Sequence, residues 1–359
     1  MAKSSGGSPK KRSPRNPAKS ILSIPDFAKY LGLSTWTVSR AINGHPEVNE
    51  KTRRRIMAAM EEVGFRPNPL ARGLGGRRTS MVGVCFMGLG NPILDQKVFH
   101  LQEFLRRNQL RGLLEMRPRD VQQEIYAIDD FKRIRVDGVV LLYSDLDGKT
   151  SEELFEGLAC VHVDPHFPQT IASVALDRHR AMRLVLEHLI RLRHESFALI
   201  GISKSDLWRW PALVDTVKAH GLDPARALRV VEEIPQVDSP IEAGEMMTEL
   251  VLRWPSRPTA IIAVDDRTAL GAVQALRNAG IEVPQQMSVT GFDNLDFARK
   301  LHPTLTTVEQ NPLRLMERAG AILLEQINLP AAKRGRHTPE FVAPELIIGE
   351  STGPAPVRS

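Results

Sequence analysis

Four side chains between positions 35 and 40 have the types and the spacing that can contact DNA bases. Thr35, Trp36, Ser39 and Arg40 lie on the polar side of a short predicted helix, and positions four apart project together. An arginine can pair with both major-groove acceptors of guanine, and threonine and tryptophan can contact thymine methyl groups. The alternative for Trp36 is burial against a neighbouring helix. The pattern favours a face that reads bases.

Helical spacing of apolar residues places this face in a unit of three short helices. The first is predicted over 24–31 with Ser23 as its N-cap, and Ser34 caps the second. Asn49 caps the third helix, which ends at Gly64. A tight glycine turn between the first two helices is typical of a helix-turn-helix unit.

Positive charge is concentrated in the first 78 residues, which carry 16 lysines and arginines against 5 acidic residues, while the rest of the chain carries 32 against 37. Residues 1–20 hold six basic and no acidic side chains and predict a disordered tail that attracts phosphates. Thr52 and the arginines at 53–55 can also reach phosphates. The balance indicates a nucleic-acid-binding module, although a solvated basic tail that binds nothing would give the same balance.

The residue pattern changes near position 79, which predicts a second, larger domain after it. Prolines and a glycine–arginine joint predict a linker over 67–79, between a helical head at 21–66 and a core at 80–359. Short apolar runs then alternate with amphipathic helical stretches, which predicts two α/β lobes with parallel, doubly wound sheets. Such folds hold ligands outside the carboxyl ends of their strands or between lobes. The strands are predicted at 81–87, 138–142, 197–202, 260–264 and 288–291, with helices at 180–192 and 268–279.

Several classes of protein are excluded or disfavoured by what the sequence lacks. No apolar run reaches the ~18 residues of a membrane helix, and the N-terminus has no signal-peptide core. Cys85 and Cys160 cannot form a disulfide framework, and both fit a cytoplasmic protein. Without a phosphate-binding loop, a dinucleotide fingerprint or a nucleophile elbow, we predict no cofactor and no catalytic residues. His162, Asp164 and His166 have loose metal-like spacing, but a loop after a strand explains them better, so no metal is predicted.

The motifs together resemble the LacI–GalR family of bacterial transcription regulators. In the head, Thr37-Val38-Ser39-Arg40 and Asn43 match the core of the family's DNA-binding motif. The resemblance continues almost to the C-terminus, which makes the combination far more specific than any one motif. Its landmarks in the core are Arg135-Val136-Asp137-Gly138, Gly271-Ala272-Val273 with Leu276, Gly291-Phe292-Asp293 and Leu305-Thr306-Thr307-Val308.

The resemblance implies a cytoplasmic repressor that binds operator DNA as a homodimer, with one head on each half of a near-palindromic site. Thr35, Trp36 and Arg40 would read bases in the major groove. A helix over 68–74 would lie in the minor groove, where Leu74 would wedge between base pairs and kink the duplex. The alternative for Leu74 is an apolar side chain that stabilises its own helix. Further DNA contacts are implied for Ser39, Asn43 and Thr52.

The core resembles periplasmic sugar-binding proteins, which implies a small polar effector, such as a sugar, between the lobes. Arg209, Asp265 and Asp293 match positions that contact effectors in the family. A guanidinium and carboxylates suit hydroxyl groups because charged hydrogen bonds are strong and directional. The alternatives are a helix cap for Asp293, bonds to loop amides for Asp265 and a surface charge for Arg209.

Departures from the family pattern bear on the effector. Asp265-Asp266 replaces the usual Asn-Asp, and Asp177-Arg178 replaces Asp-Asn. Ile93-Leu94 and Ser239 stand where aromatic residues usually stack on the ligand. These changes argue against a standard hexose and even allow a core without effector response. Two alternative functions stay open for the whole chain. One is a sugar-processing α/β enzyme with a DNA-binding head, and the other is a stand-alone transport protein, which the basic head disfavours.

Overall fold

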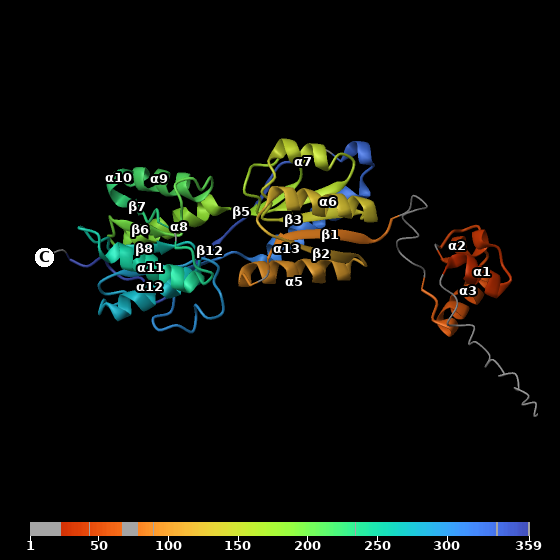
Figure 1. Cartoon of the computed structure of the whole chain (residues 1–359), viewed down its shortest axis with the longest axis horizontal. Coiled ribbons are helices and arrows are strands. Elements are labelled where there is room, and N and C mark those ends of the chain that lie inside the picture. The colour runs from red at the N-terminus through yellow and green to blue at the C-terminus, as the bar shows by residue number, and fades with distance from the viewer. Residues whose placement is uncertain are drawn as a thin grey trace, which may run out of the picture. The chain divides into compact units, whose positions relative to one another are not determined.

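The computed structural model describes residues 23–42, 44–66, 78–88, 90–233, 235–334 and 337–357. The chain divides into two compact units, Met1–Thr79 and Ser80–Ser359 (Figure 1). The predicted tail at 1–20, Asn43 and Leu74 lie outside the described residues.

The described part of the first unit consists of the helices that the sequence predicts. α1 spans Ile24–Leu31, α2 spans Thr35–Ile42 and α3 spans Glu50–Val63. The side chains of Ser23, Ser34 and Asn49 accept hydrogen bonds from the first turns of these helices, as predicted for N-caps.

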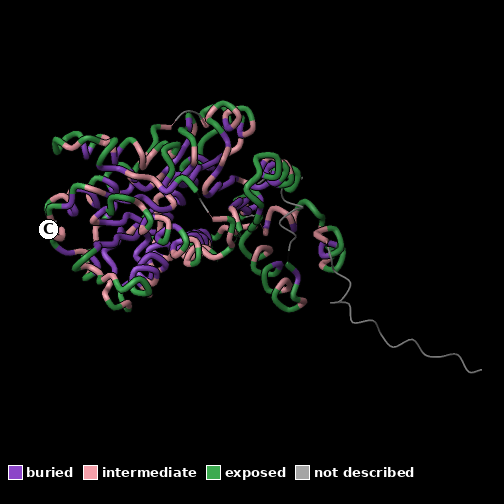
Figure 2. Tube along the Cα trace, turned by 60° about the vertical axis from the view of Figure 1, so that its left-hand side comes forward, coloured by how far each residue is buried: buried purple, intermediate pink, exposed green. Residues whose placement is uncertain are grey.

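A small apolar core holds the three helices together. Phe27, Val38 and Ile56 contribute one fully buried side chain from each helix. Phe65 stacks on Phe27 with ring centroids 4.6 Å apart and closes the core after α3. Because each helix buries only a narrow apolar face, its other faces remain available for contacts outside the unit (Figure 2).

Within the described residues, the second unit begins with a lobe built on a six-stranded sheet in the order β11-β5-β4-β3-β1-β2, in which every pairing is parallel. Helices α5 and α13 cover one face of this sheet, and α6 and α7 cover the other. The strands are β1 (Met81–Met87), β2 (Arg111–Arg117), β3 (Gly138–Leu142), β4 (Ala159–Val163), β5 (Ser173–Leu176) and β11 (Glu340–Val342). The helices are α5 (Pro92–Arg107), α6 (Val121–Ile134), α7 (Gly148–Leu154) and α13 (Pro312–Asn328), and a short 3-10 helix η2 (Ala331–Lys333) follows α13.

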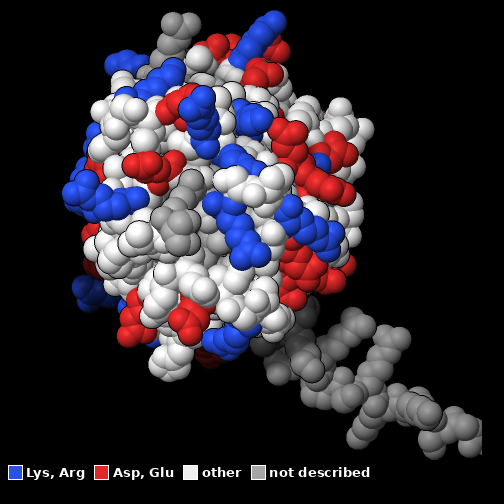
Figure 3. Space-filling model, turned by 90° about the vertical axis from the view of Figure 1, so that its left-hand side faces the viewer, with Lys and Arg blue, Asp and Glu red and all other residues white. Residues whose placement is uncertain are grey.

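The second lobe, again counting described residues, has a parallel four-stranded sheet in the order β7-β6-β8-β9. Helices α8 and α9 pack on one face, and α11 and α12 pack on the other. Figure 3 faces the end of this lobe and shows basic and acidic side chains interspersed. The elements are β6 (Phe197–Ile200), β7 (Leu228–Val230), β8 (Ala260–Ala263), β9 (Ser288–Thr290), α8 (Arg178–Arg191), α9 (Arg209–Ala219), α10 (Pro224–Ala227), α11 (Pro240–Leu252) and α12 (Asp266–Asn278).

The arrangement confirms the predicted helix-turn-helix head and two-lobed parallel α/β core. β1 and β3 have the predicted bounds, and β6, β8 and β9 end one or two residues early. The sequence did not reveal β2, because most of its side chains are exposed or half-buried at the edge of the sheet and give no apolar run. Among the described residues, no helix has the length and apolar character needed to cross a membrane.

Two glycines bring α11 and α12 into close contact. A Cβ added at Gly271 would overlap the carbonyl oxygen of Ile241, and one added at Gly244 would overlap that of Thr268. These helices can therefore pack backbone to backbone only because both positions lack a side chain. Gly271 belongs to one of the motifs on which the family resemblance depends. The close helix contact explains why that motif has a glycine at this position.

The described chain passes between the lobes at the start of α8, before α13 and between β11 and β12. Strands β10 (Thr307–Glu309) and β12 (Glu345–Ile347) pair antiparallel in this region. Asp266, at the start of α12, joins the second lobe to β10: it accepts a hydrogen bond from Thr307 Oγ1 at 2.5 Å and one from the Leu295 amide at 2.7 Å. Burial raises the pKa of Asp266 to about 8.

The raised pKa of Asp266 predicts how stability changes with pH. Up to about pH 8 the folded protein keeps this proton, whereas the unfolded chain loses it near 3.8. The free energy of unfolding therefore falls as the pH rises toward 8, by up to about 1.4 kcal/mol per pH unit, and this effect levels off above it. In Asp266→Asn the amide oxygen can accept from the Leu295 amide and the NH2 group can donate to Thr307 Oγ1, so the variant should flatten the decline between pH 6.5 and 8, measured by denaturant unfolding.

The exposed Asp238→Asn is the matched control for this change, and it should leave the wild-type pH dependence unaltered. The three proteins share every histidine and Asp293, so the difference in slope between the wild type and Asp266→Asn reports the Asp266 carboxyl. Identical slopes for wild type and Asp266→Asn would show that the carboxyl is already ionised at neutral pH in the folded protein.

Candidate functional site

The exposed face of α2 carries the side chains that the sequence singles out for base reading. Trp36 is 58 % exposed, so it is not buried against a neighbouring helix. The guanidinium of Arg40 lies over the indole ring, 4.3 Å from its centroid, and also pairs with Glu47. Thr35 is exposed on the first turn, and Ser39 is half-buried. Trp36 and Arg40 therefore contact each other on the same side of α2.

The arginines of α3 are more engaged within the head than their sequence suggests. Arg53 donates to the carbonyl of His45 at 2.6 Å, and Arg55 donates to the carbonyl of Leu31 at 3.1 Å. Arg54 pairs with Glu50 on the same helix. Arg53 and Arg55 thus tie α3 to the segments on either side of α2 and help to hold α2 in place.

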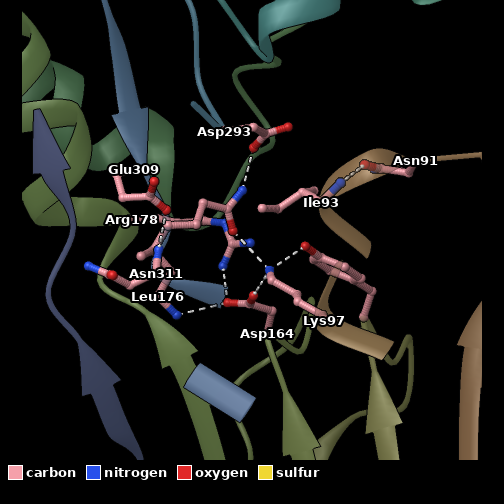
Figure 4. A network of polar contacts seen from close by, with 11 residues as sticks. Asn91, Ile93, Lys97, Asp164, Leu176, Arg178, Asp293, Glu309 and Asn311 are labelled. Carbon is pink, nitrogen blue, oxygen red and sulfur yellow. Dashed lines mark hydrogen bonds and ion pairs between the residues drawn. The ribbon is translucent and has the colours of Figure 1, made fainter. Parts of the chain in front are cut away.

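In the second unit, three residues that follow strands have a backbone conformation that is uncommon for side chains other than glycine. Tyr143 follows β3, Asp164 follows β4 and Asp293 lies beyond β9, with φ of 54°, 49° and 112°. Such conformations cost on the order of 1–3 kcal/mol each and collect at binding sites. These residues take part in the polar network that joins the lobes (Figure 4).

A fully buried lysine lies at the centre of this network. Lys97 projects from α5 and donates to Asp164 Oδ2 at 2.6 Å, to the Tyr143 hydroxyl at 2.6 Å and to Gln310 Oε1 at 2.8 Å (Figure 4). Each of the three protons of its ammonium group thus has an acceptor.

Asp164 joins the two lobes through a second cation. Its other oxygen accepts from Arg178 Nη1 at 2.6 Å and from the Leu176 amide at 2.8 Å. Burial alone would raise the pKa of Asp164, but Arg178 and Lys97 hold it well below its usual value. The carboxylate is therefore ionised and lies between Lys97 of the first lobe and Arg178 at the start of α8.

Asp293 and Arg209, two of the predicted effector contacts, lie on the second-lobe side of this network. The buried carboxylate of Asp293 accepts from the side-chain amide of Gln310, whose carbonyl faces Lys97. Burial, together with the nearby charge of Asp265, raises the pKa of Asp293 to about 7. Arg209 is the first residue of α9 and pairs with Asp206 at 2.9 Å, so it is not a free surface charge.

Asp265, the third predicted contact, is the N-cap of α12. Its carboxylate accepts from the Thr268 amide at 2.7 Å, and Arg267 Nη2 lies 3.4 Å away. Arg267 also donates to the carbonyl of Gly90 at 3.0 Å, which adds a contact between the lobes. The capping role considered for Asp293 thus belongs to Asp265.

The histidines near Asp164 do not join it in a metal site. His162 is buried on β4, and burial lowers its pKa to about 3. His166 pairs with Asp145 at 2.8 Å. Among the residues that the structure covers, no group of three histidine, cysteine or acidic side chains could hold a metal ion.

Sequence reasoning missed Lys97, Tyr143 and Gln310, and it assigned no such role to Asp164. One signal was present: Lys97 lies among Ile93, Leu94 and Val98, on the side of α5 that faces the core. A lysine in a buried stripe needs a counter-charge. That partner stands 67 positions away in the chain, so periodicity could not identify it.

Both the head and the core are similar to known proteins. A model of bacterial regulatory proteins of the lacI family matches residues 23–68, and a model of the periplasmic binding protein-like domain matches residues 186–352. The repressor PurR of Actinobacillus pleuropneumoniae is 30 % identical over 340 residues, covering 92 % of this chain and 98 % of the relative. The regulator DegA of Bacillus subtilis is 29 % identical over 343 residues, with the same two coverages.

A solved structure extends the likeness to the whole fold. The lac repressor dimer bound to operator and the anti-inducer ONPF has a TM-score of 0.80 to this chain at 25 % identity, covering 92 % of this chain and 99 % of that one. Members of the matched family are transcription regulators rather than enzymes. The chain belongs to the LacI family of bacterial transcription regulators and combines a DNA-binding head with an effector-binding core.

Proposed function

We propose that this regulator is a repressor that binds a near-palindromic operator as a homodimer and responds to a small polar, carbohydrate-like effector between its lobes. The observation that carries the DNA-binding part is the exposed face of Trp36 and Arg40 on α2. A large aromatic side chain with a cation stacked on it is a poor surface for water but fits the floor of a major groove.

Arg40 can exchange its present partner for a base. Its ion pair with Glu47 lies at the surface, where such pairs contribute only about 0–1 kcal/mol. A bidentate bond to guanine is worth about 1–3 kcal/mol of discrimination. Stacking on Trp36 restrains the guanidinium plane before DNA is present, which lowers the entropic cost of that bond.

Other residues would complete the complex with DNA. We assign phosphate or base-edge contacts to Thr35, Ser39, Asn43 and Thr52, and we assign the minor-groove wedge to Leu74. The basic segment at 1–20 would attract phosphates without regard to sequence.

A homodimer would bring two heads to the two half-sites. β2 is an edge strand, and Leu114 and Met116 project from it into solvent, as does Phe99 from α5. An unpaired edge with apolar side chains is a surface that proteins usually cover. The related lac repressor structure is a dimer on its operator, which supports the same arrangement here.

Removal of Arg40 should change which sequence is preferred. We expect Arg40→Ala to cost about 1–3 kcal/mol on the best operator and to relax preference at one symmetric pair of base positions. Trp36→Ala should alter preference at an adjacent base pair. Affinities for a panel of mutated operators, chosen after selection from random duplexes and measured at several salt concentrations, test this.

Two matched changes separate base reading from charge. Arg54→Ala removes an exposed arginine from α3, and deletion of residues 1–20 removes six positive charges. Both should weaken all operators to a similar extent, and the deletion should also make log affinity less steep in log salt. If Arg40→Ala lowers the affinity for every operator in the panel equally, Arg40 contacts phosphates rather than bases. The placement of α2 in the major groove would then be wrong.

The interlobe network supports an effector site that includes Arg209, Asp265 and Asp293. These charged groups lie near one another, since Arg209 and Asp265 both act on the ionisation of Asp293. Solved structures that share this fold contain cellobiose in one case and ribose in another. A buried carboxylate beside a guanidinium can hold the hydroxyl groups of such molecules.

Asp293 offers a direct test of this site. Loss of one partner from a buried, charged hydrogen bond costs on the order of 2–5 kcal/mol. Asp293→Ala should therefore abolish the rise in thermal midpoint that an effector from a sugar panel causes in the wild type. The exposed Asp238→Ala should respond like the wild type. An undiminished response in Asp293→Ala would place the effector elsewhere.

A further inference from the structure

The polar network between the lobes holds more positive than negative charge in direct contact. Lys97 and Arg178 are both buried, and of the described residues Asp164 is the one carboxylate that pairs with either of them. The other two acceptors of Lys97 are the hydroxyl of Tyr143 and the side-chain carbonyl of Gln310, neither of which is a carboxylate. Two buried cations thus share one anion.

The nearest further carboxylates do not pair directly with either cation. Asp293 reaches Lys97 only through the amide of Gln310, and because its pKa is about 7, much of it is protonated at neutral pH. Asp206 is occupied by the guanidinium and amide of Arg209. Each cation therefore shares its one paired carboxylate with the other, and an additional anion placed beside them would be attracted to both.

Gln310 is the group that an incoming anion can displace. It lies between β10 and α13, on the segment that joins the lobes, and its amide spans Lys97 on one side and Asp293 on the other. A neutral amide carbonyl is a weaker partner for an ammonium group than a carboxylate or a phosphate. An acidic group in its place would give two anions for two cations and would free Gln310 and Asp293 for the rest of the ligand.

We propose that Lys97 and Arg178 select an effector that bears an acidic group, a carboxylate or a phosphate, on a polar, hydroxyl-rich body. The inference rests on the proposed effector site and narrows its chemistry. Lys97 and Arg178 hold the acidic group beside Asp164, and Arg209 and Asp293 hold the hydroxyl groups. The acidic group takes the place of the Gln310 carbonyl and thereby acts on the connection between the lobes.

Acidic sugars and their neutral parents provide the test. The full chain is heated with glucuronate or glucose, and with ribose 5-phosphate or ribose, at equal ionic strength and millimolar concentration. At least one acidic member should raise the thermal midpoint by several degrees while its neutral parent does not. The glucuronate arm reports a carboxylate, and the ribose 5-phosphate arm reports a phosphate.

Variants assign the effect to this site rather than to the basic head. Lys97→Met should remove the shift, and Lys97→Arg should retain most of it because the charge is kept. Lys218→Met, an exposed lysine on α9, is the matched control and should behave like the wild type. Circular dichroism of Lys97→Met checks that it is folded, and the Lys97→Arg result stands independently of it.

Each other outcome overturns the proposal: equal shifts from acidic and neutral sugars, a shift that survives in Lys97→Met, or no shift from either acidic probe. Operator binding in the same samples keeps the proposed function separate. If the wild type shows no preferred operator, the repressor assignment fails whatever the sugars do. If the protein prefers one operator but responds to a neutral sugar, the proposed repressor function is supported. In that case only the proposal of an acidic effector fails.

Discussion

The buried contacts of Asp164 with Lys97 and Arg178 are the interaction on which the geometry of the core depends. One carboxylate holds a cation from α5 of the first lobe and a cation from the start of α8, each at 2.6 Å. All three groups are buried, so these attractions are much stronger than they would be at the surface. The left-handed backbone at Tyr143 and Asp164 is tolerated because this network determines where their side chains lie.

The same network includes a residue of the segment that connects the lobes. Gln310 lies between β10 and α13 and contacts both Lys97 and Asp293, while Thr307 on β10 is bonded to Asp266. A ligand that changes the partners of Gln310 therefore acts on a segment that both lobes share. Regulation of this kind needs a difference in ligand affinity between two arrangements of the lobes, and a buried, charged contact made in only one of them can provide it.

The head depends on different physics. Its core consists of a few apolar side chains around Phe27, and the face proposed to contact DNA carries Arg40 and Trp36 at the surface. Surface pairs such as Arg40 with Glu47 are weak, so the face can exchange partners when DNA approaches. The paired charges of the core network are buried, whereas those on α2 lie at the surface.

The sequence by itself determined the features that depend on neighbours a few positions apart. N-caps at Ser23, Ser34 and Asn49, the polar face of α2 and the apolar runs of β1 and β3 follow from local spacing and residue type. The tertiary structure alone decided that Lys97 meets Asp164 and Gln310, and that Asp265 rather than Asp293 caps a helix. Lys97 and Gln310 are 213 positions apart, and a one-dimensional pattern cannot choose among the carboxylates and amides available at that range. Long-range pairing of charges is set by how the sheets stack and where their strands end, and these are properties of the folded chain.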